Sequence, residues 1–147
     1  MLKTTRRKFL KETLVAGTAL AVCGTKSTAR ISGANNRLRI AVAGVHGRGG
    51  SHIKGWLDQD NVEIAYLIDP DERVLAQKMK YIEGRTEGKF ACQGVADVRQ
   101  ALDDKNLDAI SIATPNHWHS LMTIWAAQAG KHVYVEKPMS HDIVEGR

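Results

Sequence analysis

The 147-residue sequence is poor in cysteine, proline and aromatic residues, and it has no long apolar run. Cys23 lies in a segment that we expect to be removed, so Cys92 would be the only thiol and no internal disulfide is possible. The apolar run Thr13–Val22 has ten residues, whereas a helix needs about 20 to cross ~30 Å of hydrocarbon. No metal-ligand spacing and no internal repeat occurs, and the length suggests one folded domain.

The positive charge is concentrated at the N-terminus. The net charge is +5, but residues 1–29 hold six basic groups and one acid, and residues 30–147 hold 15 of each sign. A neutral body lacks the basic surface that nucleic-acid binding requires. We therefore exclude nucleic acid as the main partner.

The segment 1–29 has the composition of an export signal. It combines a basic start, the short apolar run and small residues suited to cleavage. The adjacent Arg6 and Arg7 resemble the twin-arginine class of signals. We expect this segment to engage the export machinery and make the protein periplasmic or exported, with residues 30–37 as a linker. The alternative is a basic amphipathic helix that stays attached.

From residue 38 onward, short apolar runs alternate with helical patterns. The predicted strands are 38–43, 62–68, 89–92, 109–113 and 132–135. The predicted helices are 50–59, 71–83, 96–103, 116–129 and a last one that begins at Ser140. In the fourth of these helices, we expect one apolar stripe, formed by Trp118, Leu121, Met122, Trp125 and Ala129. Apolar strands joined by helical crossovers predict an α/β fold with a doubly wound parallel sheet.

A glycine-rich loop follows the first predicted strand. In Gly44-Val45-His46-Gly47-Arg48-Gly49-Gly50, Gly44 and Gly49 fit the dinucleotide pattern G-x-G-x-x-G. His46 occupies the second glycine position, so its side chain must point away from the phosphates or shift the loop. A strand before the loop and a helix after it favour a pyrophosphate-binding turn over a flexible surface turn.

An acid ends the second predicted strand. Asp69 lies 25 residues after Gly44, where a carboxylate can accept hydrogen bonds from both ribose hydroxyls of NAD and would repel the 2′-phosphate of NADP. We therefore expect NAD, with NADP as the alternative because Arg73 is near in the sequence. Asp69-Pro70 would otherwise be only a turn.

Two further polar segments follow the fourth and fifth predicted strands. Thr114-Pro115-Asn116-His117 opens a helix, where Thr114 suits the cofactor and Asn116 or His117 suits nicotinamide or substrate. His117 and His119 point apart at helical spacing, which disfavours a metal. A lysine beside the cofactor crevice, here Lys137 after Glu136, can exchange a proton with a substrate hydroxyl. Alone, these segments would be a helix cap and a solvated strand end.

Taken together, the glycine turn, the strand-end Asp69, ATPNHWH and AGKHVYVEKPMS closely resemble the glucose–fructose oxidoreductase/inositol dehydrogenase (Gfo/Idh/MocA) family. This resemblance, over residues 38–147, implies an N-terminal Rossmann domain that binds NAD(P) and a second domain for sugars, polyols or related hydroxy compounds. It also implies that Lys137 transfers the proton during hydride transfer. The expected cofactor-binding residues are Gly44, His46, Gly47, Arg48, Gly49, Asp69, Thr114, Pro115, Asn116, His117, Glu136 and Lys137.

The family's second domain has no counterpart in these 147 residues. We therefore expect a nucleotide-binding domain, incomplete at its C-terminus, that binds cofactor without turnover. An oligomer is expected only if the second domain is present. The alternatives are a non-catalytic nucleotide-binding module, or a family member that uses transient oxidation for elimination or glycoside cleavage.

Overall fold

The computed structural model describes residues 37–147. The predicted export signal and nearly all of the predicted linker lie outside the described residues. Within the described part, no helix is both long and apolar enough to cross a membrane.

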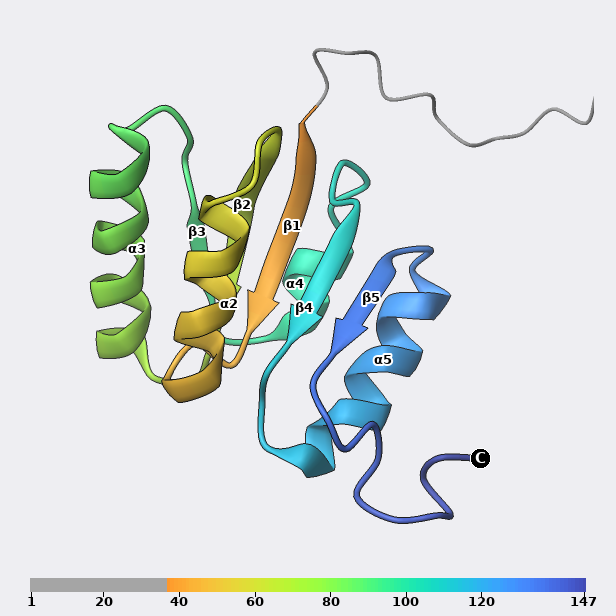
Figure 1. Cartoon of the computed structure of the whole chain (residues 1–147). Helices are drawn as coiled ribbons and strands as arrows, with labels where there is room; N and C mark the ends of the chain where they lie inside the picture. Colours follow the sequence, from red (N-terminus) through yellow and green to blue (C-terminus); the bar gives the residue numbers. More distant parts are fainter. Residues whose placement is uncertain (1–36) are drawn as a thin grey trace, which may run out of the picture. The chain divides into compact units, whose positions relative to one another are not determined.

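Five parallel strands form one sheet (Figure 1). They are β1 (Leu38–Ala43), β2 (Val62–Ile68), β3 (Gln93–Val95), β4 (Ala109–Ile112) and β5 (His132–Val135). Their spatial order is β3-β2-β1-β4-β5, and every neighbouring pair is parallel. This arrangement confirms the predicted doubly wound α/β fold.

The helices cover both faces of this sheet (Figure 1). The chain proceeds from β1 outward to β2 and β3, and then returns to the other side of β1 for β4 and β5. Because parallel crossovers are right-handed, this reversal puts the later helices on the opposite face. The helical elements are α2 (Gly47–Leu57), α3 (Glu72–Thr86), α4 (Val98–Leu102), the 3₁₀ turn η1 (Asn116–Trp118) and α5 (His119–Gln128).

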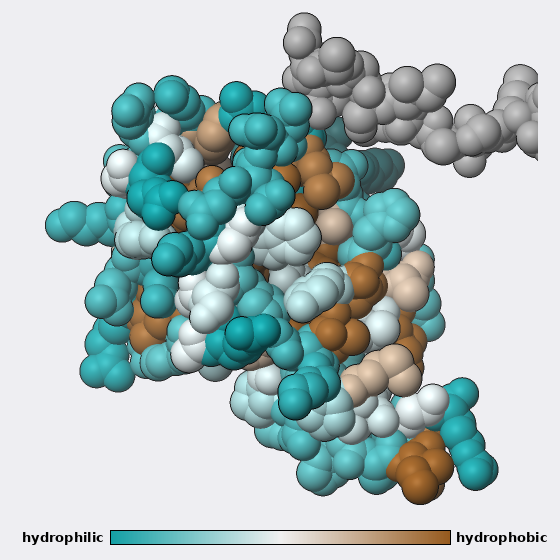
Figure 2. Space-filling view, in the orientation of Figure 1, coloured by the Kyte–Doolittle hydropathy of each residue, from teal (hydrophilic) through white to brown (hydrophobic). Residues whose placement is uncertain are grey.

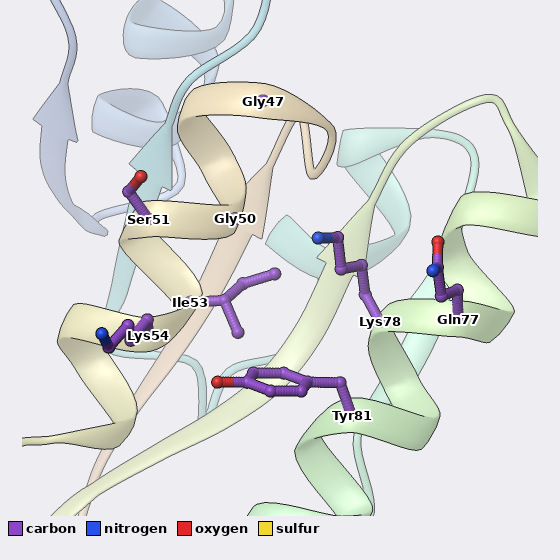
Figure 3. A pocket seen from close by; sticks show the side chains of 8 residues that line it. All are labelled: Gly47, Gly50, Ser51, Ile53, Lys54, Gln77, Lys78 and Tyr81. Carbon is purple, nitrogen blue, oxygen red and sulfur yellow. The ribbon is translucent and has the colours of Figure 1, made fainter.

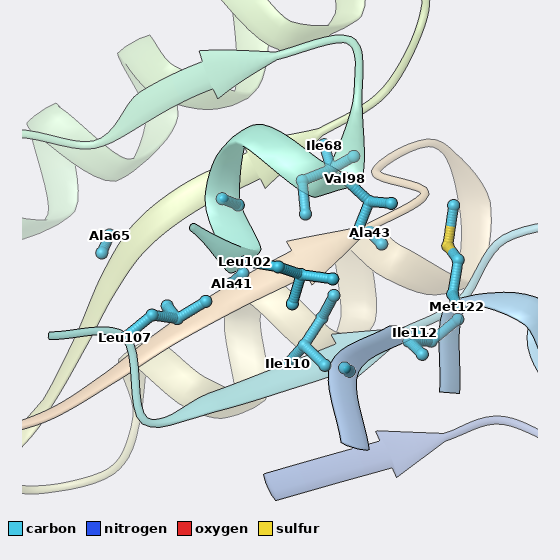
Figure 4. Close-up of a cluster of buried hydrophobic side chains, with 12 residues drawn as sticks. Ala41, Ala43, Ala65, Ile68, Val98, Leu102, Leu107, Ile110, Ile112 and Met122 are labelled. Carbon is cyan, nitrogen blue, oxygen red and sulfur yellow. The ribbon is translucent and has the colours of Figure 1, made fainter. Parts of the chain in front are cut away.

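Each face of the sheet has its own hydrophobic core. Ile110 and Ile112 of β4 pack with Val98, Leu102 and Met122 on the side of α4 and α5 (Figure 4). On the other side, the cluster beneath α2 and α3 comprises Ile40, Val42, Val45, Ile53, Ile64, Leu67, Leu75 and Ile82. The surface in Figure 2 is largely hydrophilic over α3, with hydrophobic patches beside β4 and β5 and at the C-terminal end. The central strands are therefore buried on both faces, as their composition predicts.

The third strand lies later in the chain than predicted. Helix α3 continues to Thr86 and ends at Glu87, whose φ of 53° is left-handed. Residues 89–92 are therefore needed to return from the helix end to the sheet, and only Gln93–Val95 pairs with β2. The prediction of a strand over 89–92 was wrong because it ended the helix three residues too early.

The helix predicted from Ser140 is not formed. The carboxylate of Asp142 accepts hydrogen bonds from the backbone N–H groups of Val144 (2.8 Å) and Glu145 (2.9 Å), which closes a turn instead. Ile143 is 77% exposed and Val144 is 82% exposed. A helix this short needs tertiary packing for its stability, and these side chains are largely exposed to solvent.

The buried face of α5 also differs from the predicted stripe. Its buried residues are His119, Met122 and Ala126, whereas Leu121 is exposed. The apolar stripe was therefore shifted by one position, because a buried histidine occupies a place that the hydrophobic pattern does not reveal.

Candidate dinucleotide-binding site

The predicted site residues follow the carboxyl ends of the strands, which meet at one edge of the sheet because the strands are parallel. Backbone hydrogen bonds extend the sheet one residue beyond these ends. Gly44 N–H donates to Ile68 O (2.8 Å), Ala113 N–H donates to Ala43 O (2.8 Å), and Glu136 N–H donates to Ile112 O (3.0 Å). The starting points of the site loops are thus fixed by the sheet.

The glycine loop needs bare backbone at two positions. Gly44 has a φ of +77°, and a Cβ there would lie 2.7 Å from both Ala113 O and Thr114 N. A Cβ at Gly49 would lie 1.7 Å from Gly44 O. The loops after β1 and β4 therefore meet at the point where the strand order reverses, which is where doubly wound folds bind their ligands.

The departure from the glycine pattern leaves this loop intact. The side chain of His46 is 64% exposed, and its Nε2 lies 3.9 Å from Asp71 Oδ2. Gly47 begins α2, and a Cβ there would meet nothing within 4 Å. His46 thus extends toward the start of α3, where it avoids the close backbone packing at Gly44 and Gly49.

Asp69 connects the end of β2 to the glycine loop. Its carboxylate is buried and accepts hydrogen bonds from the backbone N–H of Val45 and of Asp71, both at 3.0 Å. Each oxygen accepts one of these bonds, and a carboxylate oxygen can accept two. Asp69 therefore fixes the loop and retains hydrogen-bonding capacity beside it.

Arg73, the residue considered for NADP, pairs locally with Asp71. Its side chain is 93% exposed, and its Nη2 lies 3.4 Å from Asp71 Oδ2. The hydrogen bond from Arg73 lowers the pKa of Asp71. This ion pair opposes the positive charge of Arg73 with a carboxylate.

The segment after β4 contains a buried hydroxyl that has no partner. Thr114 Oγ1 makes no hydrogen bond within the described residues. Pro115 and His117 are exposed, and Asn116 is half-buried at the start of η1. A buried hydroxyl normally has a partner, so Thr114 is suited to meet a bound polar group.

His117 and His119 lie on different sides of the chain, as predicted. His119 is buried, with its Nδ1 2.6 Å from Pro138 O and its Nε2 2.8 Å from Thr114 O. It thereby connects the loop after β4 to the turn after β5. The described residues contain no group of three His, Cys, Asp or Glu side chains that could hold a metal.

Glu136 is held by α2, whereas Lys137 is exposed. Glu136 Oε1 accepts hydrogen bonds from His52 Nε2 (2.9 Å) and from Arg48 Nε (2.6 Å). These bonds, chiefly the one from His52, lower the pKa of Glu136 to about 2. The Lys137–Pro138 peptide bond is cis. Two of the predicted site residues, Arg48 of α2 and Glu136 after β5, therefore form an ion pair.

Two residues of this network, His52 and Ser111, were not predicted from the sequence. His52 is buried, and its Nδ1 lies 2.8 Å from the hydroxyl oxygen of Ser111, which is buried too. Ser111 is the only polar residue of β4, and His52 lies one helical turn after Arg48. A polar residue inside an apolar strand needs a partner, which is the signal that could have revealed the pair.

A cleft of about 420 Å³ lies between α2 and α3 (Figure 3). Its lining includes Ser51 and Lys54 of α2, and Lys78 and Tyr81 of α3. Of the predicted site residues, only Gly47 borders it. This cleft is therefore separate from the meeting point of the loops after β1 and β4.

Three features at this edge of the sheet suit a dinucleotide. They are the bare backbone at Gly44 and Gly49, the unpartnered hydroxyl of Thr114 and the carboxylate of Asp69. With the strand order, they define a Rossmann-type nucleotide-binding domain. Residues 38–147 match a family model described as an oxidoreductase family with an NAD-binding Rossmann fold, and the chain belongs to this family, Gfo/Idh/MocA. The resemblance inferred from the sequence is thus confirmed, as is the assignment to an NAD-binding fold.

Curated relatives include "Glycosyl hydrolase family 109 protein 2" of Shewanella sp. (strain ANA-3). The two sequences are 33% identical over an alignment 158 residues long. This alignment covers 95% of this chain and 35% of the relative. The chain therefore spans about a third of the length of this relative.

Solved structures with a similar fold include a complex with NAD and two dehydrogenases. GenD2 from gentamicin A biosynthesis, in complex with NAD, is 27% identical with a TM-score of 0.65, over 76% of this chain and 30% of that one. The WlbA dehydrogenase of Bordetella pertussis, in complex with NADH and UDP-GlcNAcA, is 26% identical with a TM-score of 0.62, over 76% and 32%. Myo-inositol 2-dehydrogenase of Lactobacillus plantarum is 27% identical with a TM-score of 0.63, over 75% and 31%.

Proposed function

We propose that this chain is the NAD-binding part of an oxidoreductase that acts on sugars, polyols or related hydroxy compounds. The observation that carries the proposal is the convergence of Gly44, Asp69, Thr114 and Glu136 at one edge of the sheet. The family membership supports NAD binding, and the solved dehydrogenases named above support a polyol or sugar-derived substrate.

Each residue has a separate role in this proposal. The backbone of Gly44 and Gly49 accommodates the pyrophosphate at the start of α2, and Asp69 accepts hydrogen bonds from the adenosine ribose. Thr114, Pro115, Asn116 and His117 line the cofactor crevice. When bound, NAD supplies a hydride acceptor, and its reduced form supplies a hydride donor.

Lys137 exchanges a proton with the substrate hydroxyl. Its ammonium group is exposed and follows the anchored Glu136 directly, so it reaches outward from a fixed point of the sheet edge. Glu136 is an acceptor for two cationic or N–H donors and remains ionised, which leaves the proton transfer to Lys137.

We further propose that residues 1–147 alone bind NAD without turnover. The chain spans about a third of its relatives, and hydride transfer requires a substrate held in a closed, oriented site. Residues 1–29 would direct export through the twin-arginine route, which moves proteins that have already folded and acquired their cofactor.

The experiment compares this chain with a longer protein in which it is extended by the substrate domain of a Gfo/Idh/MocA relative. Lys137→Ala in the longer protein should reduce turnover by about 10²-fold or more, with the Kd for NAD unchanged. Lys105→Ala is the matched control, because Lys105 is exposed and precedes the amino end of β4, at the opposite edge of the sheet. Retained turnover in Lys137→Ala would contradict the role of Lys137.

A second candidate is glycoside cleavage through transient oxidation of the sugar. The observation that favours it is the name of the Shewanella relative, which is given as a glycosyl hydrolase. In this case the longer protein would cleave a glycoside without net formation of NADH. A net increase in NADH absorbance with substrate would favour the simple dehydrogenase.

A further inference from the structure

Four side chains from three parts of the fold form one continuous hydrogen-bonded chain. Ser111 Oγ of β4 lies 2.8 Å from His52 Nδ1, His52 Nε2 lies 2.9 Å from Glu136 Oε1, and Arg48 Nε donates to the same oxygen at 2.6 Å. Arg48 and His52 are successive-turn neighbours on α2, and Glu136 directly follows β5. These hydrogen bonds thus connect the first turn of α2, which follows the glycine loop, to the turn that contains Lys137.

The position of His52 in this chain is set by packing. His52 is 7% exposed and Ser111 is 1% exposed. The ring of Tyr134, two residues before Glu136, contacts the His52 ring edge-on. The ring centroids are 5.4 Å apart, and the ring planes form an angle of 68°. If Ser111 donates its hydroxyl hydrogen to Nδ1, a neutral imidazole with hydrogen on Nε2 satisfies every group. His52 is therefore a buried, oriented donor toward Glu136.

We propose that His52 is a positioning residue that holds the Glu136 carboxylate, and through it the Glu136–Lys137–Pro138 turn, against the start of α2. The consequence for cofactor and proton transfer depends on the proposed function, whereas the contact itself does not. Because Glu136 is adjacent to Lys137 in the chain, fixing its side chain limits where Lys137 can reach. Glu136 also orients the exposed Arg48 beside the glycine loop.

A purely structural role for His52 makes a different prediction from a positioning role. As a structural residue, His52 would only fill its place in the core, and loss of either ring partner would matter equally. As a positioning residue, it acts through the bond to Glu136. Two substitutions separate these bonds, because the Gln side-chain amide is placed like Nε2 and the Asn amide like Nδ1. His52→Gln keeps a donor for Glu136, and His52→Asn keeps a partner for Ser111.

The main readout is the titration of Glu136 in the NAD-free chain, followed by carboxyl ¹³C NMR and assigned with Glu136→Gln. The groups that face this carboxyl are Arg48 and His52. The pKa of Glu136 should stay near the wild-type value in His52→Gln and rise by about one pH unit in His52→Asn. The Kd for NAD should stay within about twofold in His52→Gln and increase about tenfold in His52→Asn.

Equal effects of the two variants on both readouts would overturn the proposal. Ser111→Ala is the matched control, because it removes the other partner of His52 and leaves both donors to Glu136 in place. If the wild-type chain binds no NAD, the proposed function fails while the Glu136 titration still decides this inference. If neither His52 variant folds, the Nε2–H signal decides it: this proton should exchange slowly in the wild-type chain and rapidly in Glu136→Ala, which removes the acceptor, and equal exchange would overturn the proposal.

Discussion

Glu136 makes the stability of the folded chain depend on pH. Hydrogen bonds from His52 and Arg48 lower its pKa from 4.5 to about 2. A carboxyl with a lower pKa in the folded state stabilises the fold above its unfolded pKa, and this contribution is lost as the pH falls through the folded value. Between pH 4.5 and about 2, the wild-type chain should therefore lose stability more steeply than Glu136→Gln.

Urea midpoints measured at a series of pH values provide the test. Above pH 6 the difference between wild type and Glu136→Gln should be constant, because Glu136 is fully ionised there. If the urea midpoints of the two proteins differ by the same amount at every pH down to 2, the Glu136 carboxyl does not make the hydrogen bonds described here.

Single residues of the site were predictable where the backbone demands them. Gly44 and Gly49 follow from the turn pattern, and the structure shows the close contacts that require them. His52 and Ser111 were not predicted, because a histidine on a helix and a serine in a strand each have many ordinary roles. The polar Ser111 in an apolar strand signals that it needs a partner, and the fold shows that this partner is His52, at 2.8 Å.

At the scale of elements, the end of α3 is a point of conformational cost. Glu87 has a φ of 53°, a left-handed conformation that costs a residue with a Cβ about 1–2 kcal/mol. We expect Glu87→Gly to stabilise the chain by about 0.5–1 kcal/mol, because glycine relieves this cost and loses more entropy on folding. Thermal or urea unfolding measures the change.

The same substitution four residues earlier is the control. Glu83 lies inside α3 and is exposed, so Glu83→Gly should destabilise the chain by about 1 kcal/mol. Changes of the same sign in both variants would contradict the helix end described here.

Element boundaries were predicted well for the strongly patterned strands and poorly for the short edge strand β3. The bounds of β1, β2 and β5 match the apolar runs, because these strands are strongly patterned. β3 is an edge strand of only three residues. Where it begins depends on where α3 ends, which is at the left-handed residue Glu87. The helix expected from Ser140 failed because helical spacing alone does not supply a surface to pack on.

At the scale of the whole folded unit, stability depends on the cores on both faces of the sheet. Ile110 is 1% exposed and packs in the cluster beneath α4 and α5 (Figure 4). Ile110→Ala should destabilise the chain by about 2–5 kcal/mol, since it removes buried methyl groups and leaves a cavity. The free energy of unfolding is measured by chemical denaturation, with the same dependence on denaturant concentration fitted to all variants.

Ile124 supplies the matched control, because it is the same residue type at 48% exposure. Ile124→Ala should cost less than about 1 kcal/mol. Similar losses in the two variants would mean that Ile110 is not at the centre of a core. The fold class itself was predictable from the alternation of apolar strands and helices, because that alternation allows few other architectures.

A calorimetric titration of NAD into the wild-type chain and into Gly49→Ala tests whether the glycine loop binds the dinucleotide. A Cβ at Gly49 would lie 1.7 Å from Gly44 O, so this variant should lose NAD binding while its far-ultraviolet circular dichroism stays that of the wild type. Gly55→Ala, in the same helix with no atom within 4 Å of the added Cβ, should bind like the wild type. Binding heat in the wild type and Gly55→Ala but not in Gly49→Ala is the predicted result; no heat in the wild type, or equal affinity in all three, would contradict a nucleotide site at this edge of the sheet.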